Sequence, residues 1–90
     1  MAALAVAEQI TSAAESIASN IVEGAAASSK KEFARFLDFS IKSSVELEYR
    51  LQLAFDYALT AEATWERHTL EVVEIRRMTF GLRKSVLGGG

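Results

Sequence analysis

Hydrophobic residues recur along this chain at alternating spacings of three and four, which is the period of amphipathic helices. The first such stripe consists of Val6, Ile10, Ala13, Ile17 and Ile21. Polar Glu8, Glu15, Ser19 and Glu23 fall largely outside it. The pattern predicts a first helix that begins near the amino terminus and is ended by Gly24.

The second helix has the clearest start. Ser29 and Glu32 form a Ser-x-x-Glu capping box, which satisfies free backbone donors at a helix start. A seam of coiled-coil spacing follows, comprising Phe33, Leu37, Ser40, Ser44, Leu47, Leu51, Ala54 and Ala58. Ile41, Val45, Phe55 and Leu59 form a second apolar stripe beside it. We expect a helix with two apolar flanks to be covered by more than one neighbour.

Three serines, Ser40, Ser43 and Ser44, lie midway along the second helix. Small side chains allow another backbone to approach closely, and we favour this interpretation over hydrogen bonding to a ligand. Thr60 is the predicted N-cap of a third helix, with Glu62 in its first turn. The seam of this helix comprises Trp65, Thr69, Val72, Ile75, Thr79, Leu82 and Val86, and Leu70, Val73 and Phe80 widen its apolar face.

Composition supports an all-helical fold. The 90 residues are 50% hydrophobic and contain no proline and five glycines, three of them at positions 88–90. We therefore predict one all-α domain over residues 1–87, an antiparallel up-and-down bundle of three long helices, with a flexible glycine tail at 88–90. The absence of cysteine fits a cytoplasmic protein. The apolar first seven residues are too short for a membrane span.

Parts of this sequence resemble the bacterial four helix bundle protein family, whose members include proteins encoded in intervening sequences of 23S ribosomal RNA genes. The resemblance is carried by Gln9-Ile10, Ala13-Ala14, Ser16-Ile17, Ser19-Asn20-Ile21, Glu23-Gly24, Ser29 to Phe33, Arg35-Phe36-Leu37, Ser43-Ser44, Glu46-Leu47-Glu48, Leu51 and Leu53-Ala54. It implies an up-and-down bundle that assembles as a homopentamer, without an established activity. A distant relative that works beside a reverse transcriptase makes nucleic-acid binding a further implication.

The sequence departs from this family in three places. Ala18 stands where the family usually has proline, and Thr11-Ser12 stands where it usually has a basic pair. The loss of two cations weakens the case for nucleic acid. Relatives also begin with an additional helix, so we expect one helix of the four to be absent here. Three helices would then expose an apolar groove, which usually marks an interface. A helix of another copy, a helix of a separate chain or rearrangement of the three helices could cover it, and we favour self-association.

No residue pattern supports catalysis, a cofactor, a metal or a small-molecule substrate. His68 is the only histidine, Glu71 follows it by three residues, and helical metal sites need several such sets. Glu46 and Glu48 point in different directions because they are two residues apart on a helix. We therefore predict a protein that is not an enzyme.

Two polar groups are candidate sites. Asn20, Glu23 and Arg35 border the first helix connection, where they either fix that corner through hydrogen bonds and ion pairs or line a partner site. Basic residues gather at the second helix start and the third helix end: Lys30, Lys31, Arg35, Arg76, Arg77, Arg83 and Lys84. Antiparallel helices would bring them to one pole, where they either contact nucleic-acid phosphates or are neutralised by Glu32, Asp38 and Glu74.

The sequence thus favours a homo-oligomeric helical scaffold. The alternative is a nucleic-acid-binding accessory module that acts through the basic pole.

Overall fold

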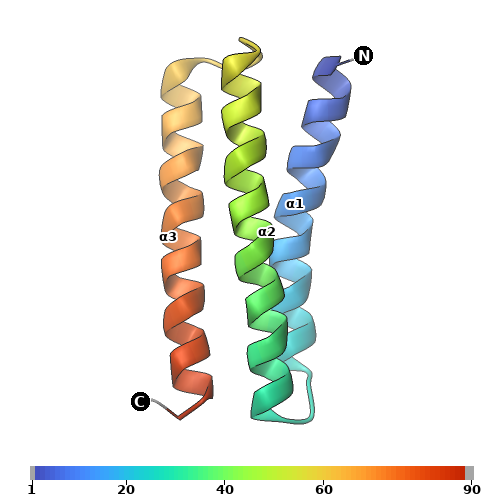
Figure 1. The fold of residues 1–90 in the computed structure, drawn as a ribbon, viewed down its shortest axis with the longest axis vertical. Helices are drawn as coiled ribbons and strands as arrows, with labels where there is room; N and C mark the ends of the chain where they lie inside the picture. The colour runs from blue at the N-terminus through green and yellow to red at the C-terminus, as the bar shows by residue number, and fades with distance from the viewer. Residues whose placement is uncertain (1, 89–90) are drawn as a thin grey trace.

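The computed structural model describes residues 2–88 and contains three helices, which confirms the all-helical prediction. They are α1 (Ala2–Ala25), α2 (Lys30–Asp56) and α3 (Glu62–Val86), and no strand occurs among the described residues. Consecutive helices run in opposite directions, with α2 in the middle (Figure 1). The family resemblance implied four helices, and the described part of the chain has three.

The connection between α1 and α2 depends on a close contact at Gly24. This residue is buried inside α1, which continues through Ala25, so the prediction that Gly24 ends the helix is wrong. A Cβ atom at Gly24 would lie 2.7 Å from Cδ1 of Phe33 and 3.0 Å from Cβ of Phe36. Glycine is needed here because α2 starts against the last turn of α1. The capping box is confirmed at its serine, since Ser29 Oγ accepts a hydrogen bond from the Glu32 backbone N–H at 3.1 Å.

Serines hold α1 and α2 close together, as their spacing predicted. Ser40 is fully buried, and its hydroxyl donates to the Ile17 carbonyl oxygen at 3.0 Å. Ser43 and Ser16 share a hydrogen bond between their hydroxyl oxygens at 2.7 Å. The Ser44 hydroxyl donates within its own helix to the Ile41 carbonyl at 2.6 Å. Each hydroxyl thus has a protein partner, and those of Ser40 and Ser43 find theirs across the α1–α2 interface.

The connection between α2 and α3 is a Schellman motif built without glycine. Ala58 has a φ of 57°, and its N–H bonds to the Phe55 carbonyl while the Leu59 N–H bonds to the Ala54 carbonyl, both at 2.9 Å. Ala58 is therefore outside α2 and exposed, contrary to its predicted place in the seam. The N-cap of α3 is Ala61, with no side-chain cap, so the prediction of Thr60 is wrong. The helix-ending turn fixes this connection in place of a side-chain cap.

The last turn of α3 is also followed by a residue with a positive φ, here a glycine. Gly88 has a φ of 81°, and its N–H donates to the Ser85 carbonyl at 3.0 Å. Sequence reasoning placed Gly88 in the tail, whereas here it completes the C-terminal turn of a helix. Gly89 and Gly90 lie outside the described residues.

The core forms along α2. Ala13 and Ile17 of α1, Leu47 and Leu51 of α2 and Val72 of α3 make one buried cluster. Ile10, Ile21, Trp65 and Ile75 pack against it. The Trp65 ring stacks on Phe55 with centroids 4.4 Å apart.

The predicted seams are buried unevenly. Leu37, Ser44, Leu47, Leu51 and Val72 are buried, whereas Phe33, Trp65 and Ile75 are half-buried. Leu82 is exposed, contrary to its predicted place in the seam. The residues expected to widen the apolar face of α3 are exposed too: Leu70, Val73 and Phe80. Each has too few neighbours, because α3 packs only on α2.

The three helices form an open arrangement. Within the described residues, α1 and α3 each pack on α2, but no Cα atom of α1 lies within 8 Å of one in α3. The Cα positions span 44 × 23 × 13 Å. Three helices packed in a triangle about 10 Å apart would have a cross-section of only about 15 Å in its wider direction. The greater width shows that α1 and α3 are separated, leaving one side of α2 uncovered between them.

Candidate interaction surfaces

An apolar groove lies between α1 and α3, with α2 as its floor. Two adjoining hollows of about 340 and 330 Å³ make up the groove, and both are lined by Ile10, Leu51 and His68. Ala3, Ala7 and Ala14 line the α1 side, and Trp65, Val72 and Ile75 line the α3 side.

Spacing on the two walls fits the packing of a further helix. On α1, Ala7, Ile10 and Ala14 are separated by three and four, as are His68, Glu71 and Ile75 on α3. Such ridges accept the side chains of a helix between them. Small side chains on the α1 wall also allow a neighbouring backbone to approach closely.

His68 and Glu71 are the ionisable groups of the groove. His68 Nδ1 lies 2.9 Å from Glu71 Oε1, and both side chains are exposed. No group of three or more histidine, cysteine or acidic side chains able to hold a metal ion occurs within residues 2–88. Glu46 pairs with Arg50, and Glu48 pairs with Arg76, so these carboxylates do not face one another.

The signature residues at the first connection do not form one cluster. Asn20 Nδ2 donates to the Ser16 carbonyl at 2.8 Å and to the Ser16 hydroxyl at 3.2 Å, so it supports the α1–α2 serine contact. Arg35 pairs with Glu32, and its guanidinium lies 5.2 Å from the centre of the Phe36 ring. Glu23 is exposed, with no ion pair within the described residues. Asn20 therefore bonds within this corner and Arg35 pairs with Glu32, whereas Glu23 joins neither of them.

The predicted basic pole is largely neutralised. Arg35 pairs with Glu32, Arg77 with Glu74, and Arg83 with Asp38, where Nε lies 2.7 Å from Oδ1. Arg76 lies about two turns before Arg83 in α3, where Nη2 donates to Glu48 Oε1 at 2.6 Å. Among the described residues, Lys30, Lys31 and Lys84 make no ion pair.

Two exposed glutamates have lowered pKa values. A side-chain hydrogen bond from Arg35 lowers the pKa of Glu32, and one from Arg77 lowers the pKa of Glu74. Both carboxylates therefore stay charged to lower pH than an isolated glutamate. These pairs are held at the surface and leave neither arginine free of a counter-charge.

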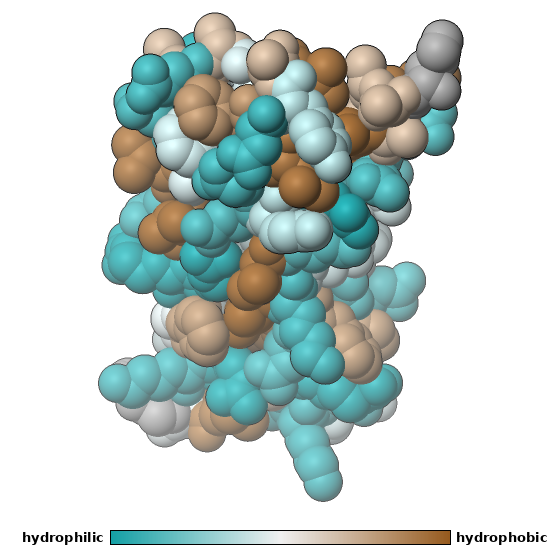
Figure 2. All heavy atoms as spheres, turned by 45° about the horizontal axis from the view of Figure 1, so that its top comes forward, coloured by the Kyte–Doolittle hydropathy of each residue, from teal (hydrophilic) through white to brown (hydrophobic). Residues whose placement is uncertain are grey.

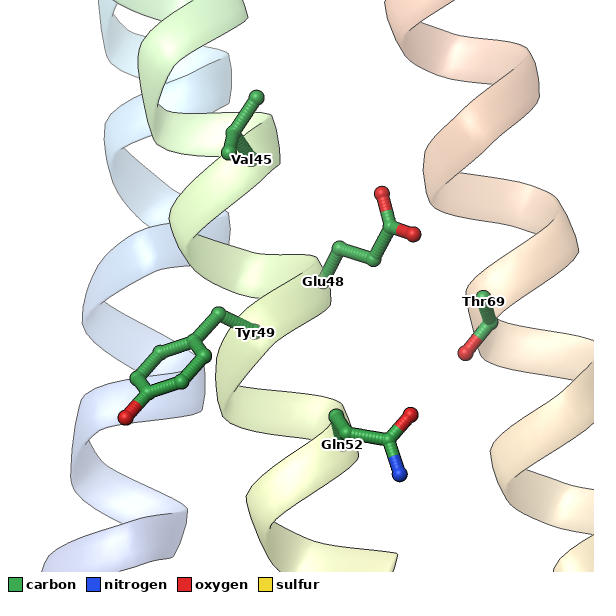
Figure 3. Close-up of a pocket in the computed structure, with 5 residues that line it drawn as sticks. All are labelled: Val45, Glu48, Tyr49, Gln52 and Thr69. Atoms are coloured by element: carbon green, nitrogen blue, oxygen red, sulfur yellow. The ribbon is translucent and has the colours of Figure 1, made fainter.

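A separate hollow, of about 380 Å³, lies between α2 and α3 away from the groove. Val45, Glu48, Tyr49 and Gln52 of α2 line it with Thr69 of α3, and Glu48 and Gln52 project toward α3 (Figure 3). The Thr69 hydroxyl is buried without a hydrogen-bond partner in the described part of the chain. Sequence reasoning missed this hollow because it assigned Val45 to a covered stripe. The signal was the spacing of Val45 and Tyr49, which are four residues apart and so share a helix face.

Comparison with protein families shows to which family the chain belongs. The model of the 23S rRNA-intervening sequence protein family matches residues 2–81. The chain belongs to this family. A crystal structure of a protein of unknown function from the S23 ribosomal protein family of Bacteroides thetaiotaomicron is similar, with a TM-score of 0.84 and 26% sequence identity. The match covers 88% of this chain and 73% of that one. No curated protein matches.

Family membership supports the resemblance found in the sequence. In this intervening-sequence protein, α1 runs through Ala18, where the resemblance led us to expect proline in relatives. None of the described helices is long and apolar enough to cross a membrane.

Proposed function

We propose that this intervening-sequence protein is a non-enzymatic cytoplasmic scaffold that self-associates and that its open groove is an assembly surface. The observation that carries the proposal is the separation of α1 from α3 above an apolar floor. Ile10, Leu51 and Trp65 lie along that groove and would be covered by a helix placed in it. Covering apolar surface of this kind is the main favourable contribution to most protein association.

The solved relative supports a fourth helix in the groove. Of this chain's 90 residues, 88% is about 79, and if those make up 73% of the relative, the relative has about 108 residues. About 29 residues of the relative thus lie outside the match, enough for a helix as long as α1, which has 24 residues. We propose that a helix of another copy lies in this groove. The resemblance implies five copies in the assembly.

A charge placed in the groove tests this proposal. Ala14 is exposed and lines the groove, so Ala14→Glu would bury a carboxylate at the interface without disturbing the fold of one copy. Ala5 is also exposed on α1 and does not line either groove hollow, so Ala5→Glu is the matched control. Light scattering coupled to size exclusion should show a smaller mass for Ala14→Glu only. Equal masses for the two variants and the natural chain would contradict the groove as an assembly surface.

Nucleic-acid binding is the second candidate function, because Lys30, Lys31 and Lys84 lie toward one end without ion pairs among the described residues. Phosphate contacts of this kind weaken as salt rises. Replacing all three lysines by glutamine should abolish salt-sensitive retention of RNA or DNA. Retention that persists in this variant would count against the candidate.

A further inference from the structure

The α2–α3 side opposite the groove carries a second uncovered surface, here called the back face. Its centre is apolar and aromatic: Val45 is 54% exposed, Tyr49 57%, Val73 41% and Phe80 54%. Val45 and Tyr49 are four residues apart, and Val73 follows Thr69 by four and precedes Phe80 by seven, so each set shares a helix face. The hollow lies between Val45 and Tyr49 of α2 and Thr69 of α3 (Figure 3).

Hydrophobic side chains are exposed at several places on the molecule. On the face shown in Figure 2, hydrophobic residues lie at the surface between charged ones along the length of the molecule. The back face differs from scattered exposure, because Val45 and Tyr49 line one hollow and the other two large side chains share the helix face of Thr69 on its α3 side.

Opposite charges lie at the two ends of the back face. Asp56, Glu62 and Glu66 lie toward the α2–α3 connection, and none makes an ion pair in the part of the chain that the structure describes. Lys31 and Lys84 lie toward the other end, Lys42 lies near the middle of α2 on that side of Tyr49, and these three also make none there. The arginines near them are already paired within the chain: Arg35, Arg77 and Arg83. The uncompensated charge is therefore acidic at one end and basic at the other.

The charges are placed symmetrically about the apolar centre. Lys42 precedes Tyr49 by seven residues and Asp56 follows it by seven, a distance of about 10 Å along the helix in each direction. Glu62 and Lys84 lie eleven residues to either side of Val73. A two-fold axis near Tyr49 and Val73, perpendicular to the helices, would exchange the acidic and basic ends of each helix.

We propose that two copies of this chain pair through their back faces in an antiparallel two-fold dimer. In this dimer α2 packs on the partner's α2 and α3 on the partner's α3. Each Asp56 faces a Lys42, and each Glu62 faces a Lys84, in every case across the two copies. Such a contact is isologous, so every favourable pair occurs twice. We assign a second copy of the chain to this face because its acidic end matches its own basic end, and these two ends meet only when the two copies run in opposite directions.

The size of the face is sufficient for a stable contact. About the proposed axis α2 is paired over residues 42–56, about 21 Å, and α3 over residues 62–84, about 33 Å. At a width of about 10 Å per helix this gives roughly 540 Å² per copy, or about 1,100 Å² in total, at the lower end of specific interfaces. Tyr49 lies next to the proposed axis, so the partner's Tyr49 side chain enters the hollow beside Glu48 and Thr69. Its hydroxyl can bond to the Glu48 carboxylate or to the buried Thr69 hydroxyl, which lacks a partner in the described part of the chain.

This dimer goes beyond the proposed function, because it leaves the groove between α1 and α3 uncovered. The two surfaces can therefore be tested separately, and a substitution that abolishes association through one surface should leave association through the other unchanged. Back-face pairing gives an even number of copies, and with five copies joined through the groove it would give ten.

Charge reversal on the natural chain tests the dimer. Lys42→Glu and Asp56→Lys should each weaken back-face pairing about tenfold or more, since each change occurs twice in the dimer. An equimolar mixture of the two single variants should pair again, because each copy then offers the charge that the other needs. Glu15→Lys, on the exposed side of α1, is the control and should leave pairing unchanged. Sedimentation equilibrium measures the association constant, and circular dichroism confirms helix content.

Aromatic truncation provides an independent readout. Tyr49→Ala should weaken pairing about tenfold, whereas Tyr57→Ala should not, although Tyr57 is 60% exposed. The proposal is overturned if the charge-reversed variants and their mixture pair equally well, or if Tyr49→Ala and Tyr57→Ala have the same effect. It is overturned too if Ala14→Glu alone removes all association, because the groove would then be the sole contact.

Discussion

Gly24→Ala should destabilise this intervening-sequence protein although it replaces a helical glycine by the best helix former. The added Cβ atom would meet Cδ1 of Phe33 at 2.7 Å and Cβ of Phe36 at 3.0 Å. Real side chains essentially never approach so closely, so α1 and α2 must move apart at their shared corner. The serine hydrogen bonds further along the interface resist that movement.

The magnitude follows from two opposing effects. Overpacking of a well-packed contact costs about 1–3 kcal/mol, and glycine to alanine within a helix gains about 0.5–1 kcal/mol. The net loss should be about 1–2 kcal/mol in the free energy of unfolding. For a domain of this size, this corresponds to a fall of about 5–15 °C in the melting temperature.

Gly81 provides the matched control. It also lies inside a helix, α3, but a Cβ atom there would meet nothing within 4 Å. Gly81→Ala should therefore stabilise the protein by about 0.5–1 kcal/mol. Urea unfolding followed by circular dichroism, at one fixed protein concentration, measures both changes. Stabilisation of similar size in both variants would refute the close-contact role of Gly24.

Three further changes test the fold and its charges. Ala58→Gly should stabilise the protein by about 0.5–1 kcal/mol in urea unfolding, because glycine adopts a φ of 57° without strain; destabilisation would contradict the Schellman turn. Ser40→Ala should cost about 1 kcal/mol in the same assay, since the buried hydrogen bond to Ile17 is lost, and no change would argue against that bond. In an NMR titration, Glu74 should have a pKa below that of an unpaired glutamate, and Arg77→Gln should raise it. Because folding lowers this pKa, the pair's stabilisation is complete above the ordinary glutamate pKa and is lost as the pH falls through the lowered value.

Sequence alone predicted the helices well because their signals are local. The Ser29–Glu32 spacing predicts a helix cap, and the small serines at 40, 43 and 44 predict close helix packing. The structure shows the cap and the close α1–α2 contact. Helix ends without a side-chain signal were misplaced. The αL conformation of Ala58 follows from backbone hydrogen bonds, which an alanine in the sequence does not indicate. Gly24 was interpreted as the end of the helix, although it is required by the close contact with α2.

The candidate surfaces were less predictable, because they depend on which helices touch. The sequence indicated an apolar groove and a basic pole, but not that Arg83 pairs with Asp38 or Arg76 with Glu48. The exposure of Val45 and Leu82 could not be derived from periodicity, since a stripe shows which residues face a neighbour without showing that the neighbour is there.

The central claim is that the uncovered surfaces of this protein are covered by further copies of itself. The most direct test is the absolute mass in solution, by light scattering coupled to size exclusion, over a wide range of protein concentration. The account predicts a discrete oligomer whose mass falls in the Ala14→Glu variant and stays unchanged in Ala5→Glu. A monomer of 9.8 kDa at every concentration would contradict the account.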